Sequence, residues 1–154
     1  MTIIELNERK STTDDSKLNN LYLQFNGLLN ELKKQKLPQN VITTINHNVA
    51  ELNTSVLLGK ELKKRIKNNQ TIILAQLDKE LKIVPKKHYQ NLWGLFGFTG
   101  FGIPIGLLIG FLLDNLGLLG VGLLIGMGLG ILVGISLDKK ALQEGRQLNV
   151  EIKY

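Results

Sequence analysis

Residues 92–137 read LWGLFGFTGFGIPIGLLIGFLLDNLGLLGVGLLIGMGLGILVGISL, a long apolar stretch near the C-terminal end. Asp114 is its only ionisable side chain, and Asp114 with Asn115 divides it into two uncharged runs of 22 residues, 92–113 and 116–137. A helix of that length extends about 33 Å, enough for a hydrocarbon core of about 30 Å. The stretch therefore predicts a transmembrane helical hairpin with one tight turn.

Glycine is concentrated in this stretch, because 13 of the chain's 16 glycines lie between Gly94 and Gly134. Many of them recur every fourth residue, which clears one face of a helix and lets another helix approach closely. The plainer explanation is that transmembrane helices tolerate glycine in general. We favour helix packing, by Gly102, Gly106 and Gly110 in the first run and Gly122, Gly126, Gly130 and Gly134 in the second.

The two runs also repeat each other at an offset of 24 residues, with the pattern G-x3-G-x3-G-x2-L-D ending at Asp114 and again at Asp138. On this motif and the following Lys139-Lys140, residues 94–146 resemble bacterial glycine-zipper two-helix membrane proteins. The extra glycines of the second run, Gly117, Gly120 and Gly128, predict that hairpins self-associate. The resemblance implies a two-helix hairpin in the bacterial inner membrane. It implies no catalytic residue.

Residues 1–91 are expected to form a cytoplasmic domain of helices at about 14–36 and 38–84. They carry 15 basic and 9 acidic residues, the chain's whole net charge of +6. Heptad-like apolar stripes predict a helical hairpin or coiled coil. The second helix, if unbroken, would extend about 70 Å, so its half nearest the membrane would lack a partner within the chain. The stripes are Leu18, Leu21, Phe25, Leu28 and Leu32 in the first helix, and Ile42, Ile45, Val49, Leu52 and Val56 in the second.

The N-terminal residues, Pro85 and the segment after the hairpin each carry a further prediction. The N-terminal residues have no sustained apolar core and no small-residue cleavage site, which argues against a signal peptide. Pro85 is expected to end the second helix, and residues 138–154 to form a cytoplasmic tail that frays beyond Gly145.

Charge predicts the orientation of the hairpin. Basic residues flank its two ends while the turn has none, so both termini are expected in the cytoplasm. Aromatic residues at the start of the first run would mark the cytoplasmic interface. Pro104 should kink that run, with Thr99 satisfying freed backbone groups. The flanking lysines are Lys86, Lys87, Lys139 and Lys140, and the aromatics are Tyr89, Trp93, Phe96, Phe98 and Phe101.

A basic cluster in the second soluble helix has three interpretations. It is a solvated helix face, a surface attracted to anionic lipid headgroups, or a nucleic-acid contact. The third is the weakest, because no aromatic residues are interleaved with the basic ones. The cluster is Lys60, Lys63, Lys64, Arg65 and Lys67.

Nothing in the sequence indicates catalysis, a cofactor or a metal site. The chain has no cysteine, no phosphate-binding loop follows a strand, and His47 and His88 lack acidic or nucleophilic companions. We therefore expect an all-α, non-enzymatic membrane protein that self-associates and presents a cytoplasmic helical scaffold to an unknown protein partner. The alternative is a pore-forming or membrane-permeabilising effector.

Overall fold

The structure is a computed structural model that describes residues 2–7 and 15–153. The chain forms two compact units. The helical unit comprises Met1–Pro85 and Leu148–Tyr154, and the hairpin unit comprises Lys86–Gln147. The fold is mostly helical, with two long apolar helices at the C-terminal end. The strands β1 (Val84–Lys86) and β2 (Gln147–Glu151), which sequence reasoning missed, form a two-stranded sheet.

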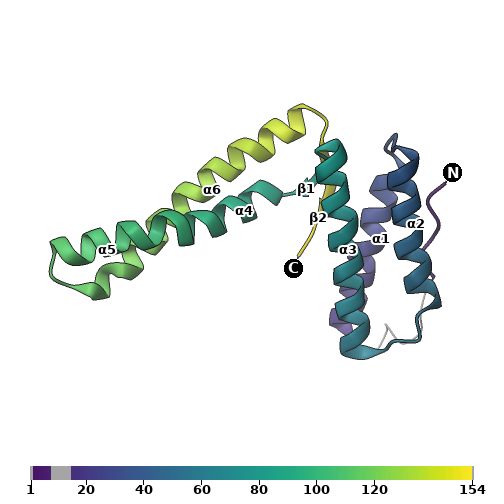
Figure 1. The fold of residues 1–154 in the computed structure, drawn as a ribbon, viewed down its shortest axis with the longest axis horizontal. Helices are drawn as coiled ribbons and strands as arrows, with labels where there is room; N and C mark the ends of the chain where they lie inside the picture. Colours follow the sequence, from purple (N-terminus) through teal and green to yellow (C-terminus); the bar gives the residue numbers. More distant parts are fainter. Residues whose placement is uncertain (1, 8–14, 154) are drawn as a thin grey trace. The chain divides into compact units, whose positions relative to one another are not determined.

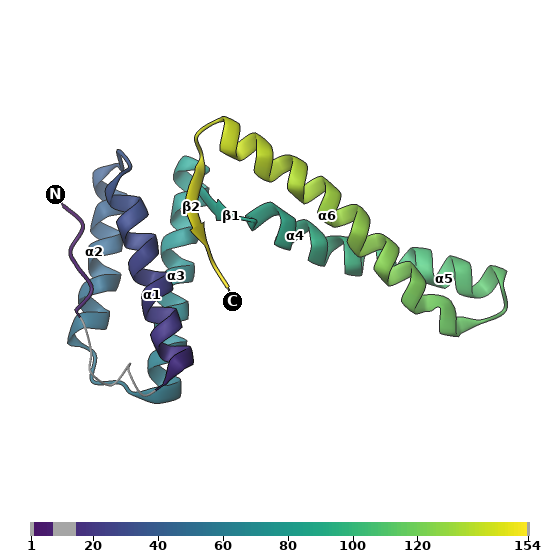
Figure 2. The same ribbon diagram turned by 180° about the vertical axis from the view of Figure 1, so that it is seen from behind.

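Three helices lie side by side in the helical unit, in both views of the ribbon (Figures 1 and 2): α1 (Ser16–Lys33), α2 (Gln39–Thr54) and α3 (Gly59–Leu81). Asp15 is the N-cap of α1, and its carboxylate accepts hydrogen bonds from the backbone N–H groups of Lys17 and Leu18. Residue 14, included in the predicted helix, lies outside the described residues. The core is apolar, with Leu18, Phe25, Leu28, Leu32, Ile45, Val49, Leu52, Leu62, Ile66, Ile73 and Leu77 all buried.

The helix expected at 38–84, whose continuity the sequence left open, is divided in two, because the chain folds back between Thr54 and Gly59. Ser55 is extended, and Gly59 begins α3 with a φ of 53°, a conformation that glycine adopts without strain. Val56, placed on the predicted stripe, lies in this connection and is 91% exposed. The second helix therefore becomes two shorter ones.

The fold-back also corrects the expectation that the later half of this helix has no partner within the chain. As α3, that half packs against α1 and α2 and buries Leu62, Ile66 and Leu77 completely. The helix α3 ends at Leu81, four residues before Pro85. Its C-cap residue is Lys82, which has a φ of 55°. Val84 and Pro85 then belong to β1.

The C-terminal tail is not frayed. After Gly145 the chain enters β2, and Leu148 and Ile152 are 1% and 3% exposed in the core of the helical unit. Gln24 of α1 accepts a hydrogen bond from the Lys153 N–H, and the Glu31 carboxylate accepts one from the Asn149 N–H. The helical unit is therefore assembled from chain on both sides of the hairpin.

The hairpin unit contains two antiparallel helices (Figure 1). The first runs through α4 (His88–Phe96), the π-helix η2 (Gly97–Gly102) and α5 (Ile103–Leu112). The second comprises the short 3₁₀ turn η3 (Leu116–Leu118) and α6 (Leu119–Gln143). Both are long and apolar enough to cross a membrane, and their most apolar windows have mean hydropathies of 2.0 and 2.5.

Candidate functional site

The two helices of the hairpin meet through glycine backbone. A Cβ added at Gly106 would lie 2.6 Å from the Leu119 carbonyl oxygen, and one at Gly102 would lie 2.8 Å from the Leu123 Cα. Real Cβ atoms essentially never come within 3.0 Å of backbone atoms. Seven positions, which we call the inner glycines, have this property: Gly97, Gly102, Gly106, Gly122, Gly126, Gly130 and Gly134.

Gly97 belongs to the inner glycines although it does not fit the four-residue series. It lies five residues before Gly102, and the turn between them is a π-helix, which takes up one extra residue. A Cβ on Gly97 would meet the Gly126 carbonyl oxygen and, at 2.9 Å, the Gly130 Cα. The π-helix thus brings glycines on both sides of the extra residue to the same contact.

Pro104 lies two residues beyond the end of this π-helix, as the second residue of α5. Proline cannot donate a backbone hydrogen bond, so the regular ladder is interrupted where the π-helix ends. Thr99 donates its hydroxyl to the Leu95 carbonyl at 3.0 Å, within its own helix.

Four other glycines of the hairpin lie away from the tightest contact. A Cβ on Gly110 would meet Asn115 and Leu116 of the turn at 3.4 Å, an ordinary contact distance. Nothing lies within 4 Å of the corresponding position on three more, which we call the outer glycines: Gly100, Gly120 and Gly128.

The turn closes with a well-defined helix cap. Asp114 has a φ of 48°, the Asn115 N–H donates to the Gly110 carbonyl at 2.8 Å, and the Asp114 N–H donates to the Phe111 carbonyl at 3.4 Å. This pair of bonds is the Schellman motif, with aspartate in the left-handed position that glycine usually takes. The Asn115 side chain then accepts from the Gly117 N–H and begins the second helix.

The second aspartate of the repeat has a different role. Asp138, on α6, is 8% exposed, and its carboxylate oxygens accept hydrogen bonds from the backbone N–H groups of Tyr89 (3.1 Å) and Gln90 (3.0 Å). These groups lie in the first turn of α4, whose N-cap residue Lys87 makes no side-chain cap. Asp138 therefore caps a neighbouring helix and ties the open end of the hairpin together.

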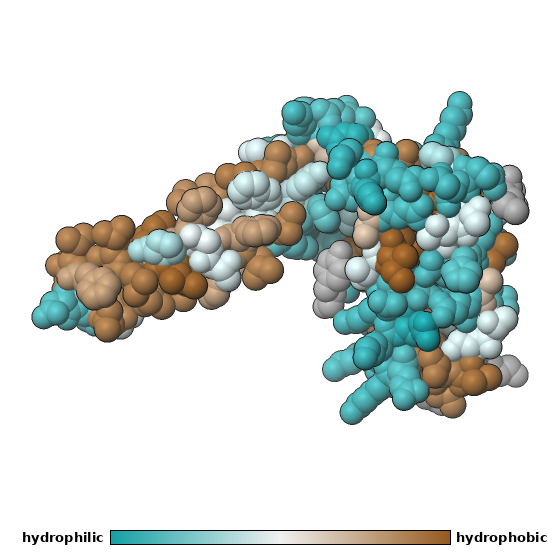
Figure 3. All heavy atoms as spheres, in the orientation of Figure 1, coloured by the Kyte–Doolittle hydropathy of each residue, from teal (hydrophilic) through white to brown (hydrophobic). Residues whose placement is uncertain are grey.

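The outside of the hairpin is apolar. Large side chains of both helices are exposed, among them Phe111 at 74%, Leu112 at 78% and Leu124 at 71%, whereas the residues buried between the helices are mostly glycines. Figure 3 shows this apolar surface in brown along the hairpin. Of the predicted interface aromatics, Phe96, Phe98 and Phe101 are exposed, and Tyr89 and Trp93 are partly buried.

The predicted basic residues fall into two groups. In the helical unit, Lys63 pairs with Asp15 and Arg65 with Glu51, each at 2.6 Å, while Lys60, Lys64 and Lys67 are exposed. In the hairpin unit, Lys86, Lys87 and Lys139 line a cavity of about 230 Å³ beside Asp138, and Lys140 lies 4.0 Å from Glu144.

Ion pairs also shift individual pKa values. The hydrogen bond and charge of Lys33 hold the pKa of Glu5 below its ordinary value, and Lys63 together with the Leu18 N–H lowers that of Asp15. Glu144 raises the pKa of Arg146.

Within residues 2–7 and 15–153, no group of three His, Asp or Glu residues could hold a metal ion. His47 is exposed on α2, and His88 stacks edge-on against Tyr89 with ring centroids 5.1 Å apart.

Comparisons with family models, with curated proteins and with solved structures find no match to this chain.

Proposed function

We propose that the chain is a non-enzymatic integral membrane protein, in which the hairpin unit spans the bilayer and the helical unit serves as a scaffold that binds a protein partner. The observation that carries the proposal is the burial pattern of the hairpin. Glycines are inside, and the bulky apolar side chains are outside.

An apolar helix in the core of a water-soluble protein would pass the same length and hydropathy test, but it would be mostly buried. Here only 22% of the most apolar window is buried in each helix. Large exposed apolar surfaces are rare on soluble monomers. Lipid chains are the solvent that suits such a surface, and helices in lipid associate by close packing at small residues.

Charge supports an orientation with both termini in the cytoplasm. The open end of the hairpin carries Lys86, Lys87, Lys139 and Lys140, whereas the turn carries only Asp114. Positively charged flanks stay on the cytoplasmic side of bacterial inner membranes. The resemblance to glycine-zipper two-helix membrane proteins is part of this proposal.

The hydrogen bonds of the hairpin favour a scaffold over a pore. The two hydroxyl side chains within its apolar runs 92–113 and 116–137, Thr99 and Ser136, donate to the Leu95 and Leu132 carbonyls of their own helices. An aqueous path needs polar groups along its wall. The inner glycines are occupied by contacts within one chain, so opening a lesion would require the hairpin to come apart.

Cysteine labelling tests the insertion and the orientation. The chain lacks cysteine, so each of the single substitutions Ser16→Cys, Asn115→Cys and Lys153→Cys reports on which side of the membrane that one position lies. With an impermeant maleimide on intact cells we expect only position 115 to react. Labelling of position 16 or 153 without lysis would contradict the orientation, and extraction of the protein by alkaline carbonate would contradict insertion.

Permeability separates the scaffold from the pore. We expect the membrane potential to persist at high expression, and liposomes containing the purified chain to retain a trapped dye. Rapid depolarisation and leakage that disappear in Gly126→Leu would assign the chain to the permeabilising class.

A further inference from the structure

The open end of the hairpin unit contains a cavity of about 230 Å³, which we call the basic cavity. It is lined by the start of α4, one face of α6 and the adjoining chain, and every residue of its lining belongs to the hairpin unit. Pockets for whole small molecules measure about 300–1,000 Å³. The basic cavity is therefore of a size for one chemical group, such as the headgroup of a larger ligand.

The lining of the basic cavity is positively charged. It includes three lysines, Lys86, Lys87 and Lys139, and one acid, Asp138, a net charge of +2. The Asp138 carboxylate already accepts from two backbone N–H groups in the first turn of α4, and the positive end of that helix offsets its charge. Among the described residues, Lys86 and Lys139 make no ion pair. The cavity therefore suits an anion.

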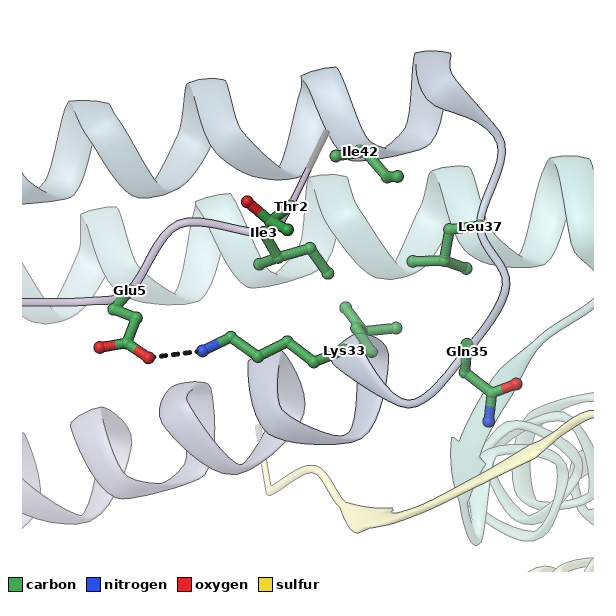
Figure 4. A pocket seen from close by; sticks show the side chains of 8 residues that line it. Thr2, Ile3, Glu5, Lys33, Gln35, Leu37 and Ile42 are labelled. Carbon is green, nitrogen blue, oxygen red and sulfur yellow. Dashed lines mark hydrogen bonds and ion pairs between the residues drawn. The ribbon is translucent and has the colours of Figure 1, made fainter.

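A larger cavity in the helical unit shows the contrast. It measures about 510 Å³ and also has a lysine in its wall, but there Lys33 forms an ion pair with Glu5 at 2.9 Å (Figure 4). One cation and one anion balance each other at that site. At the end of α6, the acid Glu144 is paired with Lys140 and Arg146, neither of which lines the basic cavity. The basic cavity thus keeps its surplus of positive charge.

The basic cavity also lies where the apolar runs of the hairpin end. Ile135 belongs to the second run, 116–137, whereas Lys139 and Leu142 lie beyond it. Their spacing of four and seven residues places all three on one face of α6. A ligand seated there would meet ammonium groups and apolar carbon together. Basic pockets at the cytoplasmic ends of transmembrane helices bind anionic lipid headgroups in this way.

We propose that the basic cavity binds the phosphate of an anionic phospholipid, with the glycerol and the first acyl carbons against Ile135 and Leu142. The positive lining disfavours headgroups that carry an ammonium group, because Asp138, the one carboxylate in the wall, already serves as a helix cap. Phosphatidylglycerol and cardiolipin, which carry phosphate and no ammonium group, are the lipids that fit. The inference rests on the proposed insertion of the hairpin into a bilayer and names a lipid that it binds there.

The test uses the full chain in micelles of a neutral detergent, titrated separately with phosphatidylglycerol and with phosphatidylcholine. Native mass spectrometry counts the lipid molecules that each chain retains. One basic residue near an anionic lipid is worth about fivefold in affinity. Since several lysines line the cavity, we expect one phosphatidylglycerol to be retained per chain, with half-occupancy at a concentration at least about tenfold below that for phosphatidylcholine.

Two adjacent lysines of α6 provide a matched pair of variants. Lys139 and Lys140 are both exposed and carry the same charge, but only Lys139 lines the basic cavity. Lys139→Gln should raise the phosphatidylglycerol concentration at half-occupancy about fivefold, and Lys86→Gln should do the same. Lys140→Gln, the control, should leave it unchanged. Melting followed by circular dichroism verifies that each variant folds as the parent does.

Three results would overturn the inference. Equal retention of the two lipids by the parent chain would remove the selectivity. Equal weakening by Lys139→Gln and Lys140→Gln would assign the selectivity to the general charge of the open end. Displacement of the lipid by an equal concentration of inorganic phosphate would assign the cavity to a soluble anion. Carbonate extraction and cysteine labelling decide insertion independently, so an inserted chain without lipid selectivity would contradict this inference alone.

Discussion

Gly126 and Gly128 lie two residues apart on α6 and face different surroundings. A Cβ on Gly126 would meet the backbone of Gly97 and Gly102, whereas nothing lies within 4 Å of the same position on Gly128. Backbone cannot move aside as the end of a flexible side chain can. The difference provides a matched pair of substitutions that change the same number of atoms in the same helix.

Gly126→Ala should force the two helices of the hairpin apart and lower its thermal stability in detergent. Gly128→Ala should leave stability unchanged or raise it, because alanine favours a helix over glycine by up to about 1 kcal/mol. Melting followed by circular dichroism, with a disulfide between engineered cysteines across the hairpin as a distance probe, measures both effects. Equal melting temperatures for the two variants would contradict the glycine contact.

Asp138 offers a second prediction for a single residue. Asp138→Ala removes both acceptors for the Tyr89 and Gln90 N–H groups, so the open end of the hairpin should lose about 1–2 kcal/mol, the usual cost of removing a helix cap. Asp114→Ala, at the exposed turn, is the comparison within the same repeat. Amide hydrogen exchange should rise at residues 89 and 90 in the first variant alone. Protection that persists there would show that the cap is dispensable.

At the level of the elements, the two long helices of the hairpin were predictable, because an uncharged apolar run of 22 residues is too long for an ordinary strand and is typical of a long apolar helix. The π-helix was not. Gly97 and Gly102 are five residues apart, so a search for four-residue spacing passes over Gly97. Only the facing contacts with Gly126 and Gly130 reveal that both belong to one surface.

Two further elements show what periodicity leaves open. The apolar period continues across Ser55 to Gly59, so the stripe alone could not distinguish one long helix from two that fold together. By contrast, β2 had a readable signal, because Leu148, Val150 and Ile152 alternate with Asn149, Glu151 and Lys153. Apolar residues at every second position are typical of a half-buried strand, a signal that the charges and Gly145 of the tail do not carry.

The β2 segment should contribute to the stability of the helical unit. Leu148 is 1% exposed in the core, so Leu148→Ala should cost about 2–5 kcal/mol, as for other buried leucines. Asn149→Ala is the control, since the Asn149 contact to Glu31 uses the backbone N–H, which alanine retains. Chemical denaturation of the full chain in micelles measures both. A loss below about 0.5 kcal/mol for Leu148→Ala would contradict burial of the strand.

At the level of the whole molecule, the two units bury opposite kinds of residue. The helical unit buries leucine, isoleucine and phenylalanine and exposes charged side chains. The hairpin unit buries glycine and exposes leucine and phenylalanine. Because the helical unit includes residues on both sides of the hairpin, the proposed scaffold would hold both ends of the hairpin on one side of the membrane.

The hairpin contact also bears on self-association. The inner glycines are already occupied within one chain, so a second copy would have to use another surface. The outer glycines Gly120 and Gly128 leave α6 open to a close neighbour, and lipid-exposed small residues favour helix contacts. We therefore expect the chain to form homo-oligomers through this face of α6.

Gly128→Leu should reduce the size of these oligomers while the hairpin itself stays folded. Gly126→Leu should instead disrupt the hairpin, because its side chain would occupy the space of the facing backbone. Native mass spectrometry from micelles gives the oligomer size, and the engineered disulfide across the hairpin reports its integrity. A parent chain that is monomeric at every concentration would contradict self-association, and a Gly128→Leu variant with unchanged oligomers would exclude this face of α6 as the interface.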